Sequence, residues 1–210
     1  MLLEIEGLYK KYGSKEVIKN LNFIINSPGI IGIVGESGCG KSILIKIIIG
    51  SLLPTSGKIN IYSKLGFSMQ NNAIYQSLTV RENLDYFATI YEVRNKGAVI
   101  DNILQELSLK QYENITINNL SGGTQKRVDI ACALINDPET IVLDEPFTGL
   151  DSKLTKELTS LLINLHNKGK TIIITSHILE TIDGLCTKFF LMENGALLEI
   201  KKGDLRNKVI

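Results

Sequence analysis

The sequence lacks several features that would assign it to a special class of protein. Its 210 residues include no tryptophan, 4 prolines and 3 cysteines. The cysteines are far apart and without C-x-x-C spacing, so neither a disulfide scaffold nor a zinc site is indicated. Lys and Arg total 23 against 22 Asp and Glu, which is not the basic excess typical of proteins that bind a nucleic-acid backbone. No nucleic-acid partner is therefore expected.

Long hydrophobic runs are missing as well. A membrane-spanning helix needs about 18 consecutive apolar residues, and the richest stretch, 43–53, is shorter and is interrupted by Lys46. The N-terminus lacks the basic-then-apolar order of a signal peptide. We therefore expect a soluble, cytoplasmic chain that buries a core of its own without disulfides.

Apolar runs alternate with helical patterns, which favours an α/β fold with a largely parallel sheet. The run at 29–34 is continuously apolar, as expected for a strand that is buried on both faces. A central stretch of the chain reads mainly as helices and loops. We expect a single domain over 1–210, with an α/β core at about 1–70 and 139–210 and an inserted helical lobe at about 71–138.

A phosphate-binding motif follows the buried strand. GESGCGKS at 35–42 fits G-x-x-x-x-G-K-[ST] and opens a predicted helix. The glycines let backbone N–H groups point at phosphate oxygens, and the helix N-terminus adds partial positive charge. Lys41 can reach the β- and γ-phosphates, and the Ser42 hydroxyl can bind Mg²⁺. The predicted nucleoside-triphosphate site consists of Gly35, Glu36, Ser37, Gly38, Cys39, Gly40, Lys41 and Ser42.

Two adjacent carboxylates end a second apolar strand, well after the phosphate motif. TIVLDEP at 140–146 places Asp144 beside Glu145. Because neighbouring residues of a strand point to opposite faces, the two cannot share one task. One can hold Mg²⁺ through water, while the other faces the γ-phosphate and orients or deprotonates the attacking water. The pair predicts the hydrolytic part of the site.

A second anion-binding helix end is indicated by LSGGTQKR at 120–127. Ser121, Gly122 and Gly123 stand at the start of a predicted helix, where backbone N–H groups favour an anion. One triphosphate needs only one such helix end, so this second one calls for a different explanation.

Together these motifs resemble the ATP-binding subunit of ABC transporters, over essentially the whole chain. GESGCGKS is similar to the Walker A motif, LSGGTQ to the family signature, and IVLDEP to the Walker B motif with its following glutamate. The resemblance implies a P-loop NTPase core with a mostly parallel sheet, a small antiparallel β subdomain and an inserted helical subdomain. It also implies ATP and Mg²⁺ as ligands, with Asp144 at the metal and Glu145 as the catalytic base.

Four further residues resemble family landmarks, in the family's order. Tyr12 in LYKKYG looks like the aromatic residue that stacks on adenine, and Gln70 in GFSMQ like the glutamine that meets Mg²⁺ and the attacking water. Asp151 in TGLD is similar to the D-loop aspartate, and His177 in TSH to the switch histidine that contacts the γ-phosphate. No catalytic position is lost, so the resemblance implies active hydrolysis.

The resemblance also explains the second helix end. In this family two ATP-binding subunits, identical or homologous, pack head to tail, so the 121–123 segment of one copy would close over the nucleotide in the 35–42 loop of the other. ATP would join the copies, and hydrolysis would separate them. A membrane-spanning transporter subunit would receive this motion and hold the chain at the inner face of the cell membrane. Residues 71–95 are expected to dock that subunit.

Export is the favoured direction of transport, because DEPFTGLD and SHILETID resemble the efflux branch that handles drugs, antibiotics or peptides. The ATPase of a small importer is the alternative. Another alternative is a soluble ATPase that uses the same type of ATP-binding domain in chromosome maintenance or translation. Such a protein would need a coiled-coil insertion or a second ATP-binding domain in its chain. A small-molecule kinase would leave Gln70 and the 121–123 segment unexplained.

Overall fold

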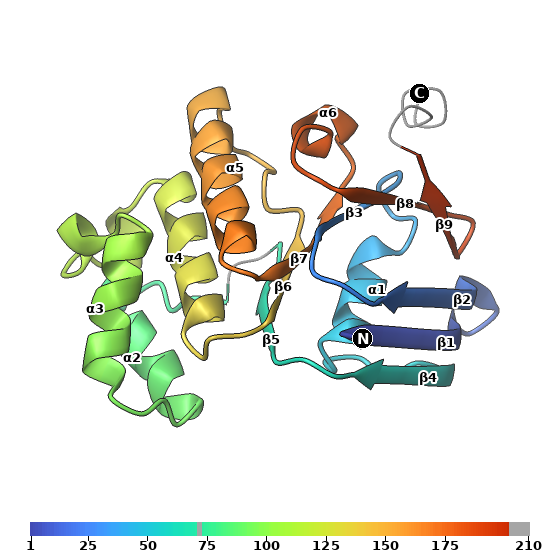
Figure 1. The fold of residues 1–210 in the computed structure, drawn as a ribbon, viewed down its shortest axis with the longest axis horizontal. Coiled ribbons are helices and arrows are strands. Elements are labelled where there is room, and N and C mark those ends of the chain that lie inside the picture. Colours follow the sequence, from blue (N-terminus) through green and yellow to red (C-terminus); the bar gives the residue numbers. More distant parts are fainter. Residues whose placement is uncertain (71–72, 202–210) are drawn as a thin grey trace.

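The structure is a computed structural model, and it describes residues 1–70 and 73–201. Its main feature is a six-stranded sheet with the strand order β5-β6-β7-β3-β8-β9 (Figure 1). Neighbouring strands are parallel except β8 and β9, which form an antiparallel hairpin whose turn is Asn194-Gly195. The strands are β3 (Ile30–Val34), β5 (Leu65–Ser68), β6 (Thr140–Asp144), β7 (Thr171–Ser176), β8 (Lys188–Glu193) and β9 (Ala196–Ile200).

A smaller antiparallel sheet lies beside it, with the strand order β2-β1-β4. Its strands are β1 (Leu3–Tyr12), β2 (Lys15–Ile25) and β4 (Ser56–Ile61). Helix α1 (Lys41–Ile48) packs between the two sheets, because Leu44, Ile45 and Ile48 share one apolar core with residues of β1, β2, β6 and β7. The predicted combination of a mostly parallel sheet and a small antiparallel one is thus confirmed. The sequence does not show that β4 and β5, three residues apart, belong to different sheets.

The other helices are α2 (Val80–Ile90), α3 (Lys96–Glu106), α4 (Gly122–Leu134), α5 (Ser152–Asn167) and the short α6 (Leu179–Ile182), with single 3₁₀ turns at Lys110–Tyr112 and Ile117–Asn119. Helices α2, α3 and α4 gather at the left of Figure 1, away from the antiparallel sheet. The capping box of Thr79 and Glu82 starts α2. Residue 71, the expected first residue of the helical lobe, lies outside the described residues.

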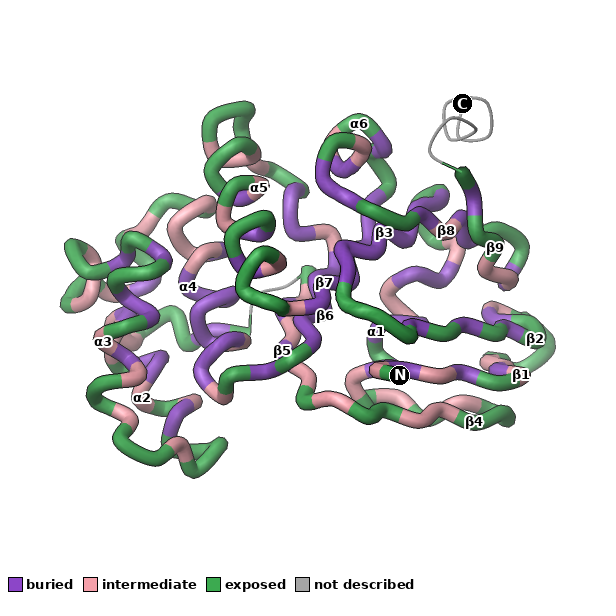
Figure 2. The backbone as a smooth tube through the Cα atoms, in the orientation of Figure 1, coloured by how far each residue is buried: buried purple, intermediate pink, exposed green. Residues whose placement is uncertain are grey.

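The centre of the larger sheet is the most deeply buried part of the molecule (Figure 2). Every residue of β3, β6 and β7 is buried, which explains their continuous apolar sequences. Helix α4 approaches β5 so closely that a Cβ at Gly66 would lie 2.1 Å from the carbonyl oxygen of Ala133. The core therefore ties the helical lobe directly to the edge of the sheet.

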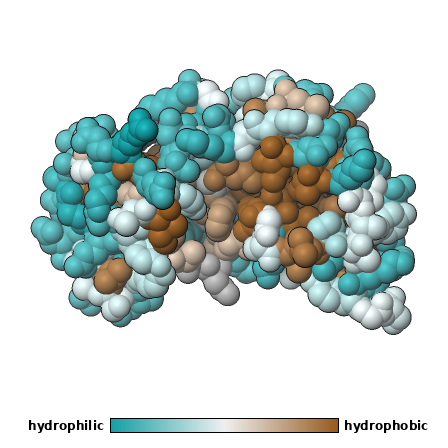
Figure 3. Space-filling view, turned by 90° about the horizontal axis from the view of Figure 1, so that it is seen from below, coloured by the Kyte–Doolittle hydropathy of each residue, from teal (hydrophilic) through white to brown (hydrophobic). Residues whose placement is uncertain are grey.

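The surface differs between the two halves. Seen from below, hydrophobic residues gather over the centre and right of the molecule, whereas the helical side at the left is mainly hydrophilic (Figure 3). Among the residues that the structure describes, none of the helices combines the length and the apolar character needed to cross a membrane.

Candidate active site

Three segments of the candidate site meet at one edge of the larger sheet. Strands β6, β7 and β3 are neighbours and run parallel, so their carboxyl ends lie on the same side. The segments that follow them begin at Gly35, Glu145 and His177. Ligands of open parallel sheets bind at this edge. Motifs that are far apart in the sequence are therefore brought together, as the sequence predicts.

The loop at 35–40 requires glycine where its backbone is left-handed. Gly38 has a φ of 81°, and Gly40, directly before α1, has a φ of 113°. A Cβ at Gly40 would also lie 2.9 Å from the Met192 side chain and 3.1 Å from that of Val17. The loop can thus curl against β2 and β8 and present the open N-terminus of α1, a favourable place for an anion.

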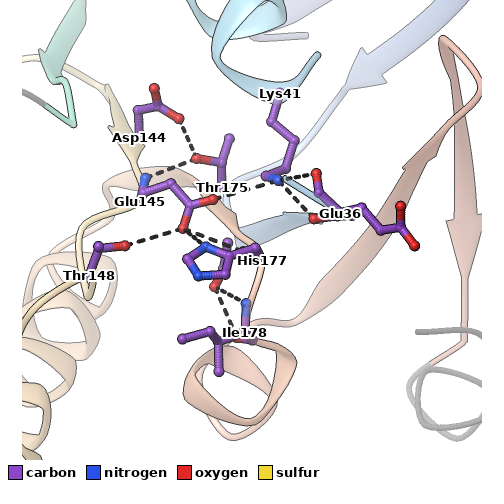
Figure 4. Close-up of polar contacts among 10 residues, drawn as sticks. Glu36, Lys41, Asp144, Glu145, Thr148, Thr175, His177 and Ile178 are labelled. Carbon is purple, nitrogen blue, oxygen red and sulfur yellow. Dashed lines mark hydrogen bonds and ion pairs between the residues drawn. The ribbon is translucent and has the colours of Figure 1, made fainter. Parts of the chain in front are cut away.

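Lys41 is the first residue of α1, and it is 5% exposed. Its ammonium group donates to the carbonyl oxygens of Gly35 at 2.7 Å and Glu36 at 3.0 Å. It also lies 3.6 Å from Oε1 of Glu145. A buried cation needs such partners to offset its loss of water. The charge of Lys41 therefore stands between the phosphate-binding loop and the carboxylate that follows β6 (Figure 4).

Glu145 bends sharply out of strand β6. Its φ is 50°, a left-handed conformation that is uncommon for residues other than glycine. The bend turns the carboxylate toward Lys41 and His177 (Figure 4), where its Oε2 lies 2.8 Å from Nδ1 of His177. The side chain of Glu145 is only 10% exposed. Unusual backbone geometry of this kind concentrates at functional sites.

A buried hydroxyl connects the two adjacent acidic residues. Thr175 of β7 is fully buried, and its Oγ1 donates to Oδ1 of Asp144 at 2.6 Å. The same oxygen accepts the backbone N–H of Glu145 at 2.9 Å (Figure 4). Thr175 therefore fixes the Asp144 carboxylate and the start of the Glu145 bend together. Sequence reasoning missed it, because a threonine in an apolar strand carries no signal except its place two residues before His177.

A cavity of about 450 Å³ adjoins the phosphate-binding loop. It is lined by residues 35–39, by residues 15–17 and Lys19 of β2, and by residues 191–195 around the β8–β9 turn. The motifs identify only the first of these segments, because the other two come from ordinary strand sequence. Tyr12 is half exposed at the end of β1, outside the cavity lining, and Nζ of Lys10 lies 5.0 Å from the centre of its ring.

Two other predicted site residues, Ser42 and Gln70, lie at the start of a helix and just after a strand. Ser42 is the second residue of α1 and is partly buried. Gln70 is exposed just beyond β5, the strand next to β6. In the described part of the chain, the polar contacts of the Lys41–Glu145–His177 group do not include Gln70.

The second predicted helix end is the capped N-terminus of α4. The Ser121 hydroxyl accepts the N–H of Thr124 at 3.3 Å, and Gly122 and Gly123 form the first turn. Asp151 caps α5 in the same way, accepting the N–H groups of Lys153 and Leu154. Among the described residues, the polar contacts of Lys41 and Glu145 include neither Ser121 nor Asp151. The predicted site residues therefore form two separate groups in one chain, one around Lys41 and Glu145 and one at the starts of α4 and α5.

Helix α4 carries a buried ion pair. Lys126 and Asp129 are 7% and 3% exposed, and their charged atoms lie 3.6 Å apart. Burial lowers the pKa of Lys126 and raises the pKa of Asp129. Lys126 donates to the carbonyl oxygen of Met69, and Asp129 accepts the N–H of Ala73. These bonds attach α4 to residues on either side of Gln70.

Known proteins resemble the chain over most of its length. The ABC transporter family model matches residues 18–148. Nod factor export ATP-binding protein I of Rhizobium leguminosarum bv. viciae is 34% identical over an alignment of 207 positions that covers 92% of this chain and 67% of the relative. ABC transporter G family member 20 of Dictyostelium discoideum is 33% identical over 95% of this chain, but the chain spans only 29% of that protein's length.

Solved structures of this family have the same fold. The structure of cbiO1 from Clostridium perfringens, part of the ABC transporter complex cbiONQ, superposes with a TM-score of 0.87 at 27% identity and covers 99% of this chain and 91% of its own. A dimeric ATP-binding cassette in a post-hydrolysis state, bound to ADP and phosphate, gives a TM-score of 0.85 at 28% identity over 96% of this chain and 99% of its own. The chain belongs to the ABC transporter family, as an ATP-binding and ATP-hydrolysing domain.

Proposed function

We propose that the chain hydrolyses ATP to drive export of a substrate through a separate membrane subunit. The observation that carries the proposal is the convergence of Lys41 and His177 on Glu145 at the carboxyl ends of adjacent parallel strands. Export is supported by the rhizobial relatives, whose names give Nod factor export as their activity.

In the proposed mechanism Glu145 acts as the general base. Its carboxylate accepts a proton from the water that attacks the γ-phosphorus, while the bond from the γ-phosphorus to the bridging oxygen of ADP breaks. Lys41 neutralises charge on the β- and γ-phosphates, for which its position beside the 35–40 loop is suited. His177 lies within contact of Glu145 and holds its carboxylate in place. Low exposure of Glu145 and Lys41 limits competing water.

The residues present fit a magnesium ion. Magnesium prefers hard oxygen ligands, and the proposed set is the hydroxyl of Ser42, the carboxylate of Asp144 and the amide oxygen of Gln70. Asp144 is buried, and one of its oxygens is already oriented by Thr175. The ion would supply positive charge to the phosphates of the bound nucleotide.

We expect replacement of Thr175 by Val to weaken Mg²⁺ binding at the site. The valine keeps the shape of the side chain, but it cannot orient the carboxylate of Asp144 or accept the N–H of Glu145. Loss of such an outer partner typically costs about 10- to 100-fold in metal affinity. The Mg²⁺ concentration for half-maximal hydrolysis should rise by at least about 10-fold, whereas Thr175→Ser, which keeps the hydroxyl, should stay near the parent. An unchanged Mg²⁺ requirement in Thr175→Val would contradict this role.

The proposed active unit contains two copies of the chain or one copy and a homologue. One similar solved structure is a dimer with ADP and phosphate. In the head-to-tail arrangement, Ser121, Gly122 and Gly123 of one copy would complete the nucleotide site at 35–42 of the other. This arrangement gives a use to the capped N-terminus of α4, which stands outside the contacts of Lys41 in its own chain.

The membrane subunit is proposed to dock on α2. A groove of about 570 Å³ lies between α2 and the start of α3, and it is lined by Leu78, Tyr86, Ile90 and Ile100 among charged residues such as Arg81 and Lys96. Ile90 is 55% exposed there. The α2 side of the groove belongs to the segment 71–95 expected to dock the partner, whereas Lys96 and Ile100 of α3 lie beyond that segment, and residues 71–72 lie outside the described chain. A cytoplasmic helix of the membrane subunit is the proposed occupant.

A matched pair of variants tests this docking. We expect Ile90→Asp to release the chain from salt-washed membranes of cells that encode it, because the carboxylate would be buried against the partner. Ile24→Asp is the control, since Ile24 is 50% exposed on β2, outside the groove. Both purified variants should bind ATP like the parent. Retention of Ile90→Asp at the parent level, or equal release of both variants, would contradict the docking site.

Import remains the second candidate direction. A solved structure described as a putative metal-chelate type ABC transporter in an inward-facing conformation has a TM-score of 0.87 at 25% identity, over 97% of this chain and 84% of its own. The export relatives are more similar in sequence, at 34% over 92% of the chain. Sequence similarity therefore favours export.

A further inference from the structure

Gly122 and Gly123 differ in their surroundings, although they are neighbours in the same signature. Apart from its chain neighbours and the backbone of its own helix, a Cβ at Gly122 would meet no described atom within 4 Å. A Cβ at Gly123 would lie 2.5 Å, 2.8 Å and 3.0 Å from Cδ1, Cδ2 and Cγ of Leu154. Neither glycine has a positive φ, so the backbone itself would accept another residue at both positions. Among the described residues, the atoms nearest to a side chain at position 123 are therefore those of Leu154.

Leu154 belongs to the first turn of α5, and its backbone is held by Asp151. The Asp151 carboxylate accepts the N–H of Leu154 at 2.8 Å. Ser121 caps α4 two residues before Gly123. The contact between Gly123 and Leu154 thus joins the capped starts of the two helices, which lie side by side and run in the same direction (Figure 1).

The surrounding contacts are tight and continue along both helices. Arg127 of α4 forms an ion pair of 2.5 Å with Glu157 of α5, about one turn beyond Gly123 and Leu154. Only about 10 Å³ of space remains at this junction, too little to admit more than about one water molecule. That space is lined by Gly123, Lys126, Arg127, Leu150, Leu154, Leu158 and Leu161.

We propose that Leu154 is a positioning residue that locks Ser121 and Asp151 into one rigid unit, and that position 123 is glycine because Leu154 occupies the space of a side chain. The proposal rests on the proposed two-copy function, in which the starts of α4 and α5 must meet the second copy together. Gly122, with open space around it, is free to face the nucleotide of that second copy. Gly123 therefore has a packing role within its own chain that Gly122 does not share.

A rescue experiment separates these roles. On a Glu145→Gln background, chosen because we expect it to bind ATP without hydrolysing it rapidly, Gly123→Ala should weaken Mg-ATP-dependent association of two copies by about 10-fold, because overpacking shifts α4 from α5. Adding Leu154→Ala makes room for the new methyl group and should restore association to within about 3-fold of Leu154→Ala alone. Gly122→Ala should also weaken association, but Leu154→Ala should not rescue it. ATP binding to the single copy should be unchanged throughout, because residues 35–42 are untouched.

Two outcomes would overturn the proposal. One is association of Gly123→Ala at the parent level, and the other is a double variant that stays as weak as Gly123→Ala. Urea unfolding of the same variants without ATP gives a measurement that does not depend on dimerisation. In this measurement Gly123→Ala should lower the free energy of unfolding, and the loss should be smaller when Leu154→Ala is also present. Equal losses from Gly123→Ala with and without Leu154→Ala would contradict the proposal. If two copies of Glu145→Gln do not associate in the presence of Mg-ATP, the proposed two-copy function fails. The unfolding measurements on the Gly123 and Leu154 variants still decide whether Leu154 fills the space beside Gly123.

Discussion

Glu145→Gln is expected to bind ATP normally and to hydrolyse it about 10²- to 10⁴-fold more slowly, the usual contribution of a general base. The amide keeps the shape of the side chain and its place beside His177, but it cannot take a proton from water. The measurement is single-turnover release of phosphate, with ATP binding measured separately.

Glu180→Gln is the matched control for this prediction. Glu180 is an exposed glutamate on α6, three residues after His177, and it lines no part of the described site. It should hydrolyse ATP at the parent rate. A Glu145→Gln variant that turns over ATP like the parent would remove Glu145 from its role as the base.

Lys41→Ala is expected to lose ATP binding itself, the step that precedes the hydrolysis affected by Glu145→Gln. Its buried ammonium group donates to the carbonyl oxygens of Gly35 and Glu36 and lies 3.6 Å from Oε1 of Glu145. Loss of one partner of a buried, hydrogen-bonded charge pair costs about 2–5 kcal/mol, which is a decrease of at least about 30-fold in affinity. Titration with ATP should show this loss, and phosphate release should fall below detection.

Lys46→Ala provides the control on the same helix. Lys46 is exposed on α1, whereas Lys41 is buried at its start. Both variants remove one positive charge, so a general electrostatic effect would weaken ATP binding equally in the two. The proposed site predicts weak binding in Lys41→Ala alone. A Lys41→Ala variant with parent affinity would contradict the assignment of the phosphate-binding loop.

The sequence predicts those parts of the molecule that depend on residues adjacent in the chain. The 35–42 motif indicates the strand, loop and helix that the structure contains, because glycine at φ above zero and a buried strand leave clear patterns. The continuous apolar runs of β3 and β7 likewise predict a buried parallel sheet. Local rules were sufficient for these elements.

Contacts between distant segments could not be predicted in the same way. Thr175 meets Asp144 across the pairing of β6 and β7, and its residue type alone does not distinguish it from other strand threonines. The left-handed backbone at Glu145 could not be predicted, because the residue in that conformation is not a glycine. The contact of Gly123 with Leu154 likewise depends on how α4 and α5 pack. Tertiary packing decides each of these features.

In the proposed mechanism, ATP joins two copies of the chain and hydrolysis separates them. The most direct test is the molar mass of Glu145→Gln by gel filtration with light scattering, with and without Mg-ATP. We expect a monomer without nucleotide and a dimer with Mg-ATP, and a Lys41→Ala, Glu145→Gln double variant that stays monomeric. A chain that binds Mg-ATP and remains a monomer would contradict assembly from two identical copies, and a chain that binds no ATP would contradict the proposed ATP hydrolysis itself.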